Sequence, residues 1–200
     1  LLALGNPLVT DQTKKWVDAM RAQDAQLPEA EKEVSELADV YGKQSKIYVG
    51  AQAREGVLKA EAGNFSVIHI AAHGIFNDVD PMYSHIALSK EEGSENEDGL
   101  LEPWEILDLD LKAEMVVLSA CETARGKIST GEGIIGFAWA FFIAGSPSIV
   151  VSQWKVDSAS TTLLMRDFHS IWRNSMNHQR ISKAQALRNA EMKLLQNKQY

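Results

Sequence analysis

The chain has 200 residues, of which 45% are hydrophobic and 24% charged, and this composition excludes bulk disorder. Its formal net charge of −7 argues against nucleic-acid binding through a basic surface. One cysteine excludes an internal disulfide and a cysteine-rich zinc site, and it fits a reducing, cytoplasmic setting.

Apolar spacing predicts strands that alternate with helices along almost the whole chain. In chain order we expect a strand at 1–4, a helix at 28–41, a strand at 47–49, a helix at 51–62, a strand at 65–72, a small strand within 81–88, a solvated acidic loop at 90–99, a helix at 102–107, a strand at 115–118, a helix at 133–144, a strand at 148–151, and amphipathic helices at 158–172 and 182–197. The longest apolar run, 134–144, is too short to span a bilayer, so we expect no membrane partner.

This alternation favours an α/β fold with a central, mainly parallel β-sheet and helices on both faces. The runs 65–72 and 115–118 are apolar on both faces, which is typical of strands inside a parallel sheet. In such sheets functional residues gather at the carboxyl ends of the strands. The residues that follow these two strands are therefore the first candidates for chemistry.

A histidine follows one of these strands and a cysteine follows the other. If the strands are neighbours, His73 and Cys121, 48 residues apart in the chain, face one cleft. A nearby imidazole raises the thiolate fraction of a thiol, whose ordinary pKa is about 8.5, and can protonate a leaving amine. The backbone N–H groups of Gly74 and Cys121 are candidate donors to an oxyanion.

Each of these residues also has a structural interpretation. A single cysteine at a strand end is more often a small buried hydrophobe, and a single histidine there is usually polar filler. Their joint placement favours a dyad. We interpret His69 as a satisfied core histidine, because no glutamate accompanies a metal pair with His73, and we expect no metal and no cofactor. His85, His169 and His178 have no evident partner in the sequence.

Together the motifs resemble the CHAT domain, a family of caspase-like cysteine peptidases that is related to separases and is often attached to tetratricopeptide repeats. The segments that carry the resemblance are Ile68-His69-Ile70-Ala71-Ala72-His73-Gly74, Leu118-Ser119-Ala120-Cys121-Glu122-Thr123, Gly131-Glu132-Gly133 and Ser152-Gln153-Trp154-Lys155-Val156-Asp157. The resemblance implies a caspase-hemoglobinase-like sandwich, with His73 as general base and Cys121 as nucleophile. It also implies a protein or peptide substrate, and a regulatory repeat domain or activating partner outside this chain.

The resemblance places substrate-binding loops after the fifth strand, where Trp154 and Asp157 lie. Glu122 is a further acidic candidate for substrate binding, and Trp154 has the alternative interpretation of an aromatic cap on the core. Ser119 stands where relatives that cleave after arginine or lysine often carry Asp. This serine argues against the particular specificity pocket with which those relatives bind a basic residue.

The chain departs from the family pattern near its ends. It begins at Leu1 without an initiator Met and stops at Tyr200, where the family usually continues into an aromatic-rich strand. We therefore expect a single domain over residues 1–200 that is a fragment, without the C-terminal edge strand and without any N-terminal repeat region.

Two functions of different classes follow. The first is a regulated cysteine endopeptidase of bacterial signalling or defence, which hydrolyses peptide bonds through the His73–Cys121 dyad. The second is a catalytically silent, caspase-like interaction or scaffold module that keeps the fold. A small-ligand-binding doubly wound domain has little support, because no Gly-x-Gly-x-x-Gly motif follows the first strand.

Overall fold

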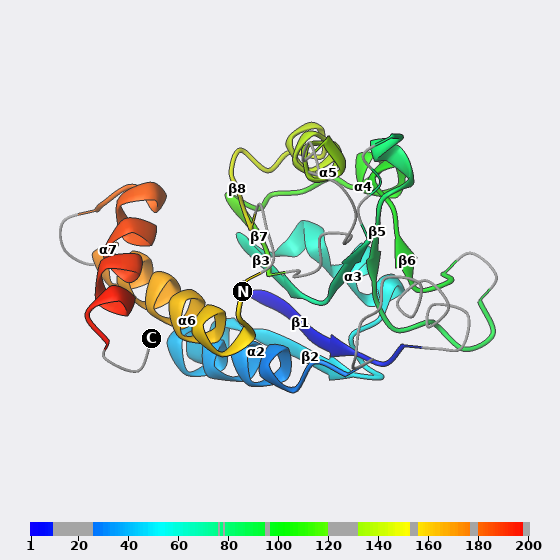
Figure 1. Cartoon of the computed structure of the whole chain (residues 1–200). Coiled ribbons are helices and arrows are strands. Elements are labelled where there is room, and N and C mark those ends of the chain that lie inside the picture. The colour runs from blue at the N-terminus through cyan, green and yellow to red at the C-terminus, as the bar shows by residue number, and fades with distance from the viewer. Residues whose placement is uncertain are drawn as a thin grey trace.

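The structure is a computed structural model that describes residues 1–9, 26–75, 77, 79–94, 97–119, 132–152, 156–176 and 180–197. Within these ranges, helices lie on both sides of a central sheet (Figure 1). None of the helices in these ranges is long and apolar enough to cross a membrane.

Five parallel strands form the central sheet, in the order β2-β1-β3-β7-β8. Their bounds are β1 Leu2–Pro7, β2 Lys46–Gly50, β3 Val67–Ala71, β7 Met115–Leu118 and β8 Ile149–Val151. Every residue of β3 and β7 is buried, as expected of apolar strands inside a parallel sheet. The α/β fold class and the mainly parallel sheet predicted from the sequence are confirmed.

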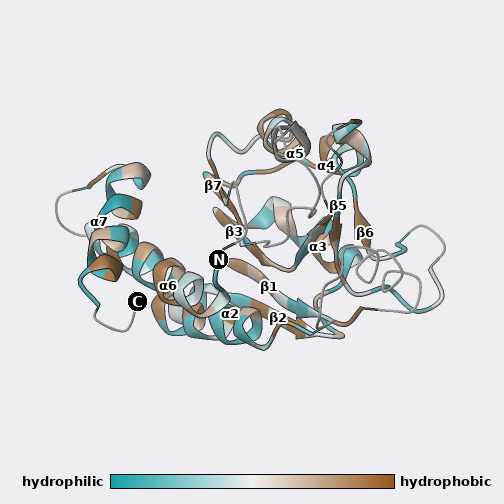
Figure 2. Cartoon of the chain, viewed as in Figure 1, coloured by the Kyte–Doolittle hydropathy of each residue, from teal (hydrophilic) through white to brown (hydrophobic). Residues whose placement is uncertain are grey.

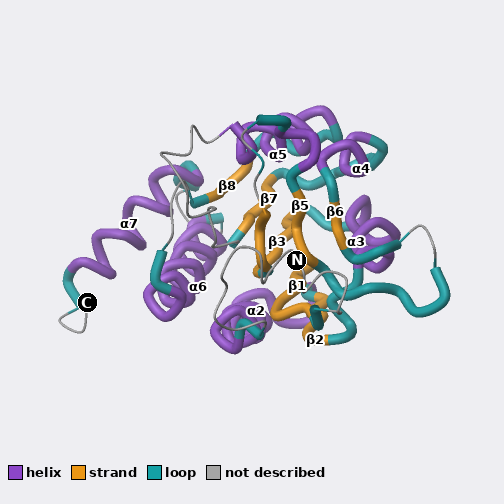
Figure 3. The backbone as a smooth tube through the Cα atoms, turned by 45° about the vertical axis from the view of Figure 1, so that its right-hand side comes forward, coloured by secondary structure: helices purple, strands orange, loops and turns teal. Residues whose placement is uncertain are grey.

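The helices cover both faces of this sheet (Figure 3). They are α2 Pro28–Tyr41, α3 Glu55–Glu61, α4 Pro103–Leu107, α5 Glu132–Ile143, α6 Ser158–Ser175 and α7 Lys183–Leu195, with short 3-10 turns η1 Gly42–Gln44, η2 Ala62–Asn64 and η3 Pro81–Tyr83. Helix α2 begins at Pro28 and ends before Gly42, as the turn residues predicted. Brown, hydrophobic residues dominate the strands, whereas α2 and α6 carry both hydrophobic and hydrophilic residues (Figure 2).

Successive strand residues point to opposite faces, so the core is divided into two apolar clusters. On one face, Ala3 and Val117 of the sheet pack with α2, α6 and α7, where Phe168 is fully buried. On the other face, Leu4 and Ile70 pack with α3, α4 and α5. The sandwich of helices on both faces follows from these two clusters.

A second, antiparallel sheet lies beside the first. It consists of β4 His73–Ile75, β5 His85–Ala87 and β6 Leu100–Leu101, in the order β4-β5-β6. The sequence predicted only the strand within 81–88. The strand predicted at 65–72 is shorter in the structure, where β3 spans Val67–Ala71, and His73 begins a new strand that the sequence did not predict.

The acidic segment 90–99 is less solvated than predicted. The side chain of Glu91 pairs with Arg54, and that of Glu97 lies 3.0 Å from the ammonium of Lys59. Both carboxylates are half-buried, because the segment packs against the start and middle of α3. The charges therefore attach this loop to a helix.

Candidate functional site

The carboxyl ends of β3, β7 and β8 lie side by side at one edge of the central sheet. Ile70 of β3 pairs with Leu118 of β7, which pairs with Val151 of β8. The backbone N–H of Ser119 donates to the carbonyl oxygen of Ile70 over 2.9 Å, which continues the ladder one residue beyond β7. The two strands that lead toward His73 and Cys121 are thus neighbours, as a dyad requires.

The chain leaves the central sheet after Ala71, the last residue of β3, and His73 is the first residue of β4. It is 4% exposed, and its backbone pairs with Ala87 of β5. The next residue, Gly74, is also buried and pairs with Ile86. The imidazole is therefore carried by the small sheet, in a position shielded from solvent.

Cys121, Glu122 and Trp154, which were predicted as nucleophile and substrate-binding residues, lie outside the described residues. Asp157 is described and exposed, and it caps α6: its Oδ2 accepts a hydrogen bond from the backbone N–H of Ser160 over 2.9 Å. Its contact with a substrate stays a prediction.

His69 belongs to a buried chain of polar groups. Its Nε2 lies 2.7 Å from Oε1 of Glu33, and its Nδ1 lies 3.2 Å from Nε2 of His169. The Nδ1 of His169 lies 2.8 Å from the hydroxyl oxygen of Tyr41. The interpretation of His69 as a satisfied core histidine is confirmed, and His169, which has no evident partner in the sequence, contacts both His69 and Tyr41.

Burial lowers the pKa of His169 well below its usual range, and the neighbouring His69 lowers it further. Burial likewise raises the pKa of Tyr41, with a smaller opposing effect of Arg173. His169 is therefore neutral at pH 7, and the chain of contacts joins α2, β3 and α6 in the core. Among the described residues, no group of three or more His, Cys, Asp or Glu is placed to hold a metal ion.

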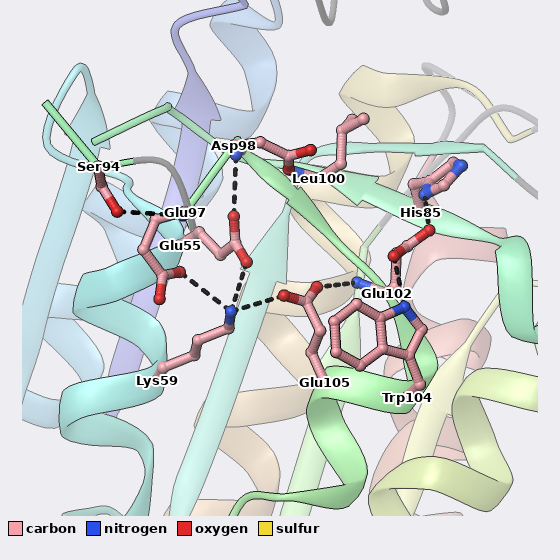
Figure 4. A network of polar contacts seen from close by, with 11 residues as sticks. Glu55, Lys59, His85, Ser94, Glu97, Asp98, Leu100, Glu102, Trp104 and Glu105 are labelled. Atoms are coloured by element: carbon pink, nitrogen blue, oxygen red, sulfur yellow. Dashed lines mark hydrogen bonds and ion pairs between the residues drawn. The ribbon is translucent and has the colours of Figure 1, made fainter. Parts of the chain in front are cut away.

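A second polar network, which the sequence analysis missed, surrounds Lys59 next to the small sheet (Figure 4). The Lys59 Nζ lies 2.6 Å from Glu55 Oε1, 2.7 Å from Glu105 Oε1 and 3.0 Å from Glu97 Oε2. The i, i+4 spacing of Glu55 and Lys59 is a local signal for the first of these contacts. The other partners come from distant segments, which spacing along the chain does not reveal.

His85 of β5 extends this region. Its Nδ1 lies 3.0 Å from Oε1 of Glu102, the residue before α4, so His85 has a partner that the sequence did not indicate. An open cavity of about 530 Å³ lies between α3 and α4, and Trp104 is part of its lining. Among the described residues that line this cavity there is no residue predicted for catalysis or substrate binding.

The CHAT domain, a caspase-like domain, matches the chain over residues 1–200. One relative is "Tetratricopeptide repeat protein 28" of Mus musculus, which is 32% identical over 97 residues. The matched segment covers 48% of this chain and 4% of the mouse protein, so the chain spans a small fraction of the relative's length.

Proposed function

Because this chain belongs to the CHAT domain family, whose fold is caspase-like, we propose that it is a cysteine endopeptidase with His73 as general base and Cys121 as nucleophile. The observation that carries the proposal is the pairing of β3 with β7. His73 and Cys121 each follow the paired residues Ile70 and Leu118 by three positions.

In the proposed reaction, the His73 imidazole removes the proton of the Cys121 thiol as the sulfur attacks the scissile carbonyl carbon. The backbone N–H groups of Gly74 and Cys121 stabilise the oxyanion that forms. The carbon–nitrogen bond then breaks, and His73 gives its proton to the leaving amine. Water, activated by His73, hydrolyses the thioester, which releases the carboxylic acid and restores the thiol.

The substrate in this proposal is a protein or peptide. Trp154, Asp157 and Glu122 are the candidates that contact it, because they follow the ends of β8 and β7 at the same sheet edge as His73. Of these, Asp157 is exposed and so is accessible to a substrate.

The proposed peptidase is regulated by a partner outside this chain. The mouse relative is named a tetratricopeptide repeat protein, which supports a repeat domain outside this chain as the partner. We propose a cytoplasmic location, because the single thiol must stay reduced to react. A role in bacterial signalling or defence is part of the same proposal.

A second candidate is a catalytically silent interaction module. The observation that favours it is an apolar surface on α5, where Trp139, Phe142 and Ile143 are each about half exposed, with 51%, 49% and 59% of their surface accessible. Large exposed apolar side chains that lie together are typical of surfaces that bind other proteins. This function needs the fold and does not need Cys121.

Cleavage of a peptide library separates the two candidates. The peptidase hypothesis predicts turnover by the wild type, and loss of turnover in Cys121→Ala and in His73→Ala with an unchanged circular dichroism spectrum. Equal turnover by the wild type and Cys121→Ala would contradict it. A peptidyl electrophile that reacts with Cys121 no faster than with free cysteine would favour the interaction module.

A further inference from the structure

The small sheet carries His73 at one end of a row of paired residues. His73 pairs with Ala87, and Ala87 pairs on its other side with Leu100. Leu100 of β6 is the outer end of this row, and Gly99 directly precedes it in the chain. Because paired strands move together, the position of Gly99 and β6 influences the position of His73.

Glu55 holds this outer end. Its side chain is fully buried, and its Oε2 accepts a hydrogen bond from the backbone N–H of Gly99 over 2.8 Å. The carbonyl of Gly99 in turn accepts from the N–H of Leu88 over 2.8 Å. Gly99 has a φ of +88°, and a Cβ there would lie 2.8 Å from the carbonyl oxygen of Leu88, so this close contact requires glycine.

The network around Lys59 also contacts the small sheet at a second point, His85 of β5. Glu105 contacts Lys59 through Oε1 and accepts from the backbone N–H of Glu102 through Oε2, over 2.8 Å. Glu102 contacts His85, and His85 pairs with Ile75, two residues beyond His73. Lys59 thus connects Glu55, which binds Gly99, with Glu105 (Figure 4). Through Glu105 it is linked to Glu102, which contacts His85 of β5.

The hydrogen bond from Gly99 to Glu55 forms in both protonation states of the Glu55 carboxyl. Burial raises the pKa of the Glu55 carboxyl to about 8, against the opposing effect of the hydrogen bond from Lys59. Partial burial lowers the pKa of Lys59, but hydrogen bonds to Glu105, Glu55 and Glu97 raise it above its usual value. A carboxyl oxygen accepts from the Gly99 N–H in either protonation state, so the contact persists around neutral pH.

We propose that Glu55 is a positioning residue for His73: through Gly99 and the β6, β5 and β4 ladders it fixes the imidazole at the end of the central sheet. This inference rests on the proposed role of His73 as general base. Glu55 acts on the chemistry through the sheet. Small displacements of a general base cost rate steeply, so the loss of this anchor has a measurable effect.

Three variants isolate the contact. Glu55→Gln keeps a side-chain oxygen that accepts from Gly99, whereas Glu55→Met keeps the length and removes the acceptor. Glu61→Met makes the same replacement at the other end of α3, where Glu61 binds Lys46 and Tyr48. Both of these partners belong to β2, on the far side of the central sheet from β7. His73→Ala is the reference for loss of the imidazole.

The first measurement is the rate at which iodoacetamide alkylates Cys121, the single cysteine, as a function of pH. We expect Glu55→Met to lose about tenfold in rate at neutral pH and to approach the pH profile of His73→Ala. Glu55→Gln should stay within about threefold of the wild type, and Glu61→Met should match it. A Glu55→Met profile equal to that of the wild type would overturn the positioning role while the dyad stands.

The second measurement, hydrogen exchange of the backbone amides, does not depend on the reactivity of Cys121. If Glu55→Met does not fold, Gly99→Ala carries the test, because a Cβ at position 99 would lie 2.8 Å from the carbonyl oxygen of Leu88 and so disturbs the same end of β6 while Glu55 stays in place. We expect exchange at residues 73–75 to increase together with exchange at Gly99, and to stay unchanged in Glu61→Met. Faster exchange at Gly99 alone would overturn the proposal. Equal alkylation of the wild type and His73→Ala would instead reject the dyad itself.

Discussion

The backbone N–H of Ser119 donates to the carbonyl of Ile70 over 2.9 Å. This bond holds the ends of β3 and β7 together where the chain continues toward His73 on one side and toward Cys121 on the other. A dyad built from two segments 48 residues apart requires such a junction.

Asp157 caps α6 and is also proposed to contact substrate, and two substitutions separate these roles. Asparagine caps helices as well as aspartate does, so Asp157→Asn should keep the wild-type melting temperature and should raise KM for the cleaved peptide. Asp157→Ala should lose about 1 kcal/mol of unfolding free energy in addition. An unchanged KM in Asp157→Asn would show that the charge of Asp157 does not contribute to substrate binding.

Gly145 follows α5 at a position that excludes a side chain. Its φ is +114°, and a Cβ there would lie 2.5 Å from the carbonyl oxygen of Leu111. We expect Gly145→Ala to lower the free energy of unfolding by about 1–3 kcal/mol, measured by urea denaturation.

Gly93 is the matched control, because its φ is +80° and no atom of the described part of the chain lies within 4 Å of a Cβ built there. Gly93→Ala carries the cost of the backbone conformation without the clash. Equal losses in the two variants would show that the close approach to Leu111 does not contribute.

The buried His169 predicts a loss of stability in acid. Its pKa is lowered on folding from the usual 6.5, so the unfolded state binds a proton below that pH while the native state does not. The free energy of unfolding should therefore fall as the pH drops below 6.5. In His169→Gln, which faces the same Tyr41 and His69, denaturant titrations should show a smaller loss. An identical pH dependence in both proteins would contradict the assignment.

Glu55 predicts the opposite trend at higher pH. Its pKa rises on folding from 4.5 to about 8, so the native state keeps a proton that the unfolded state has lost in this window. The free energy of unfolding should fall as the pH rises between these values. Glu55→Gln keeps the surroundings of Lys59, Glu97 and Glu105 and removes this titration. Its stability, measured by denaturant at several pH values, should decline less than that of the wild type.

The central sheet could be predicted from the sequence because buried parallel strands are apolar on both faces. The runs 65–72 and 115–118 have this pattern, and they became β3 and β7. The small sheet could not be predicted in the same way. Strand β6 has two residues, and a single residue, Ala72, separates β4 from the end of β3, so neither has a periodicity of its own.

The candidate site was predictable only where it follows strand ends. His73 has that position, and its distance along the chain from Cys121 is visible in the sequence. The contacts of Glu55 with Gly99 and of His69 with His169 are not visible, because these partners are 44 and 100 residues apart. The packing of the whole fold decides which distant polar groups come into contact. The spacing of residues along the chain does not predict these contacts.

The most direct test of the central claim is a distance. A crystal structure of the chain with a free Cys121 thiol gives the separation between its sulfur and the nearer ring nitrogen of His73. Proton transfer requires a contact of about 4 Å or one bridging water, and the account predicts this geometry. Sulfur and imidazole on opposite sides of the sheet edge, too far apart to share a proton, would contradict it.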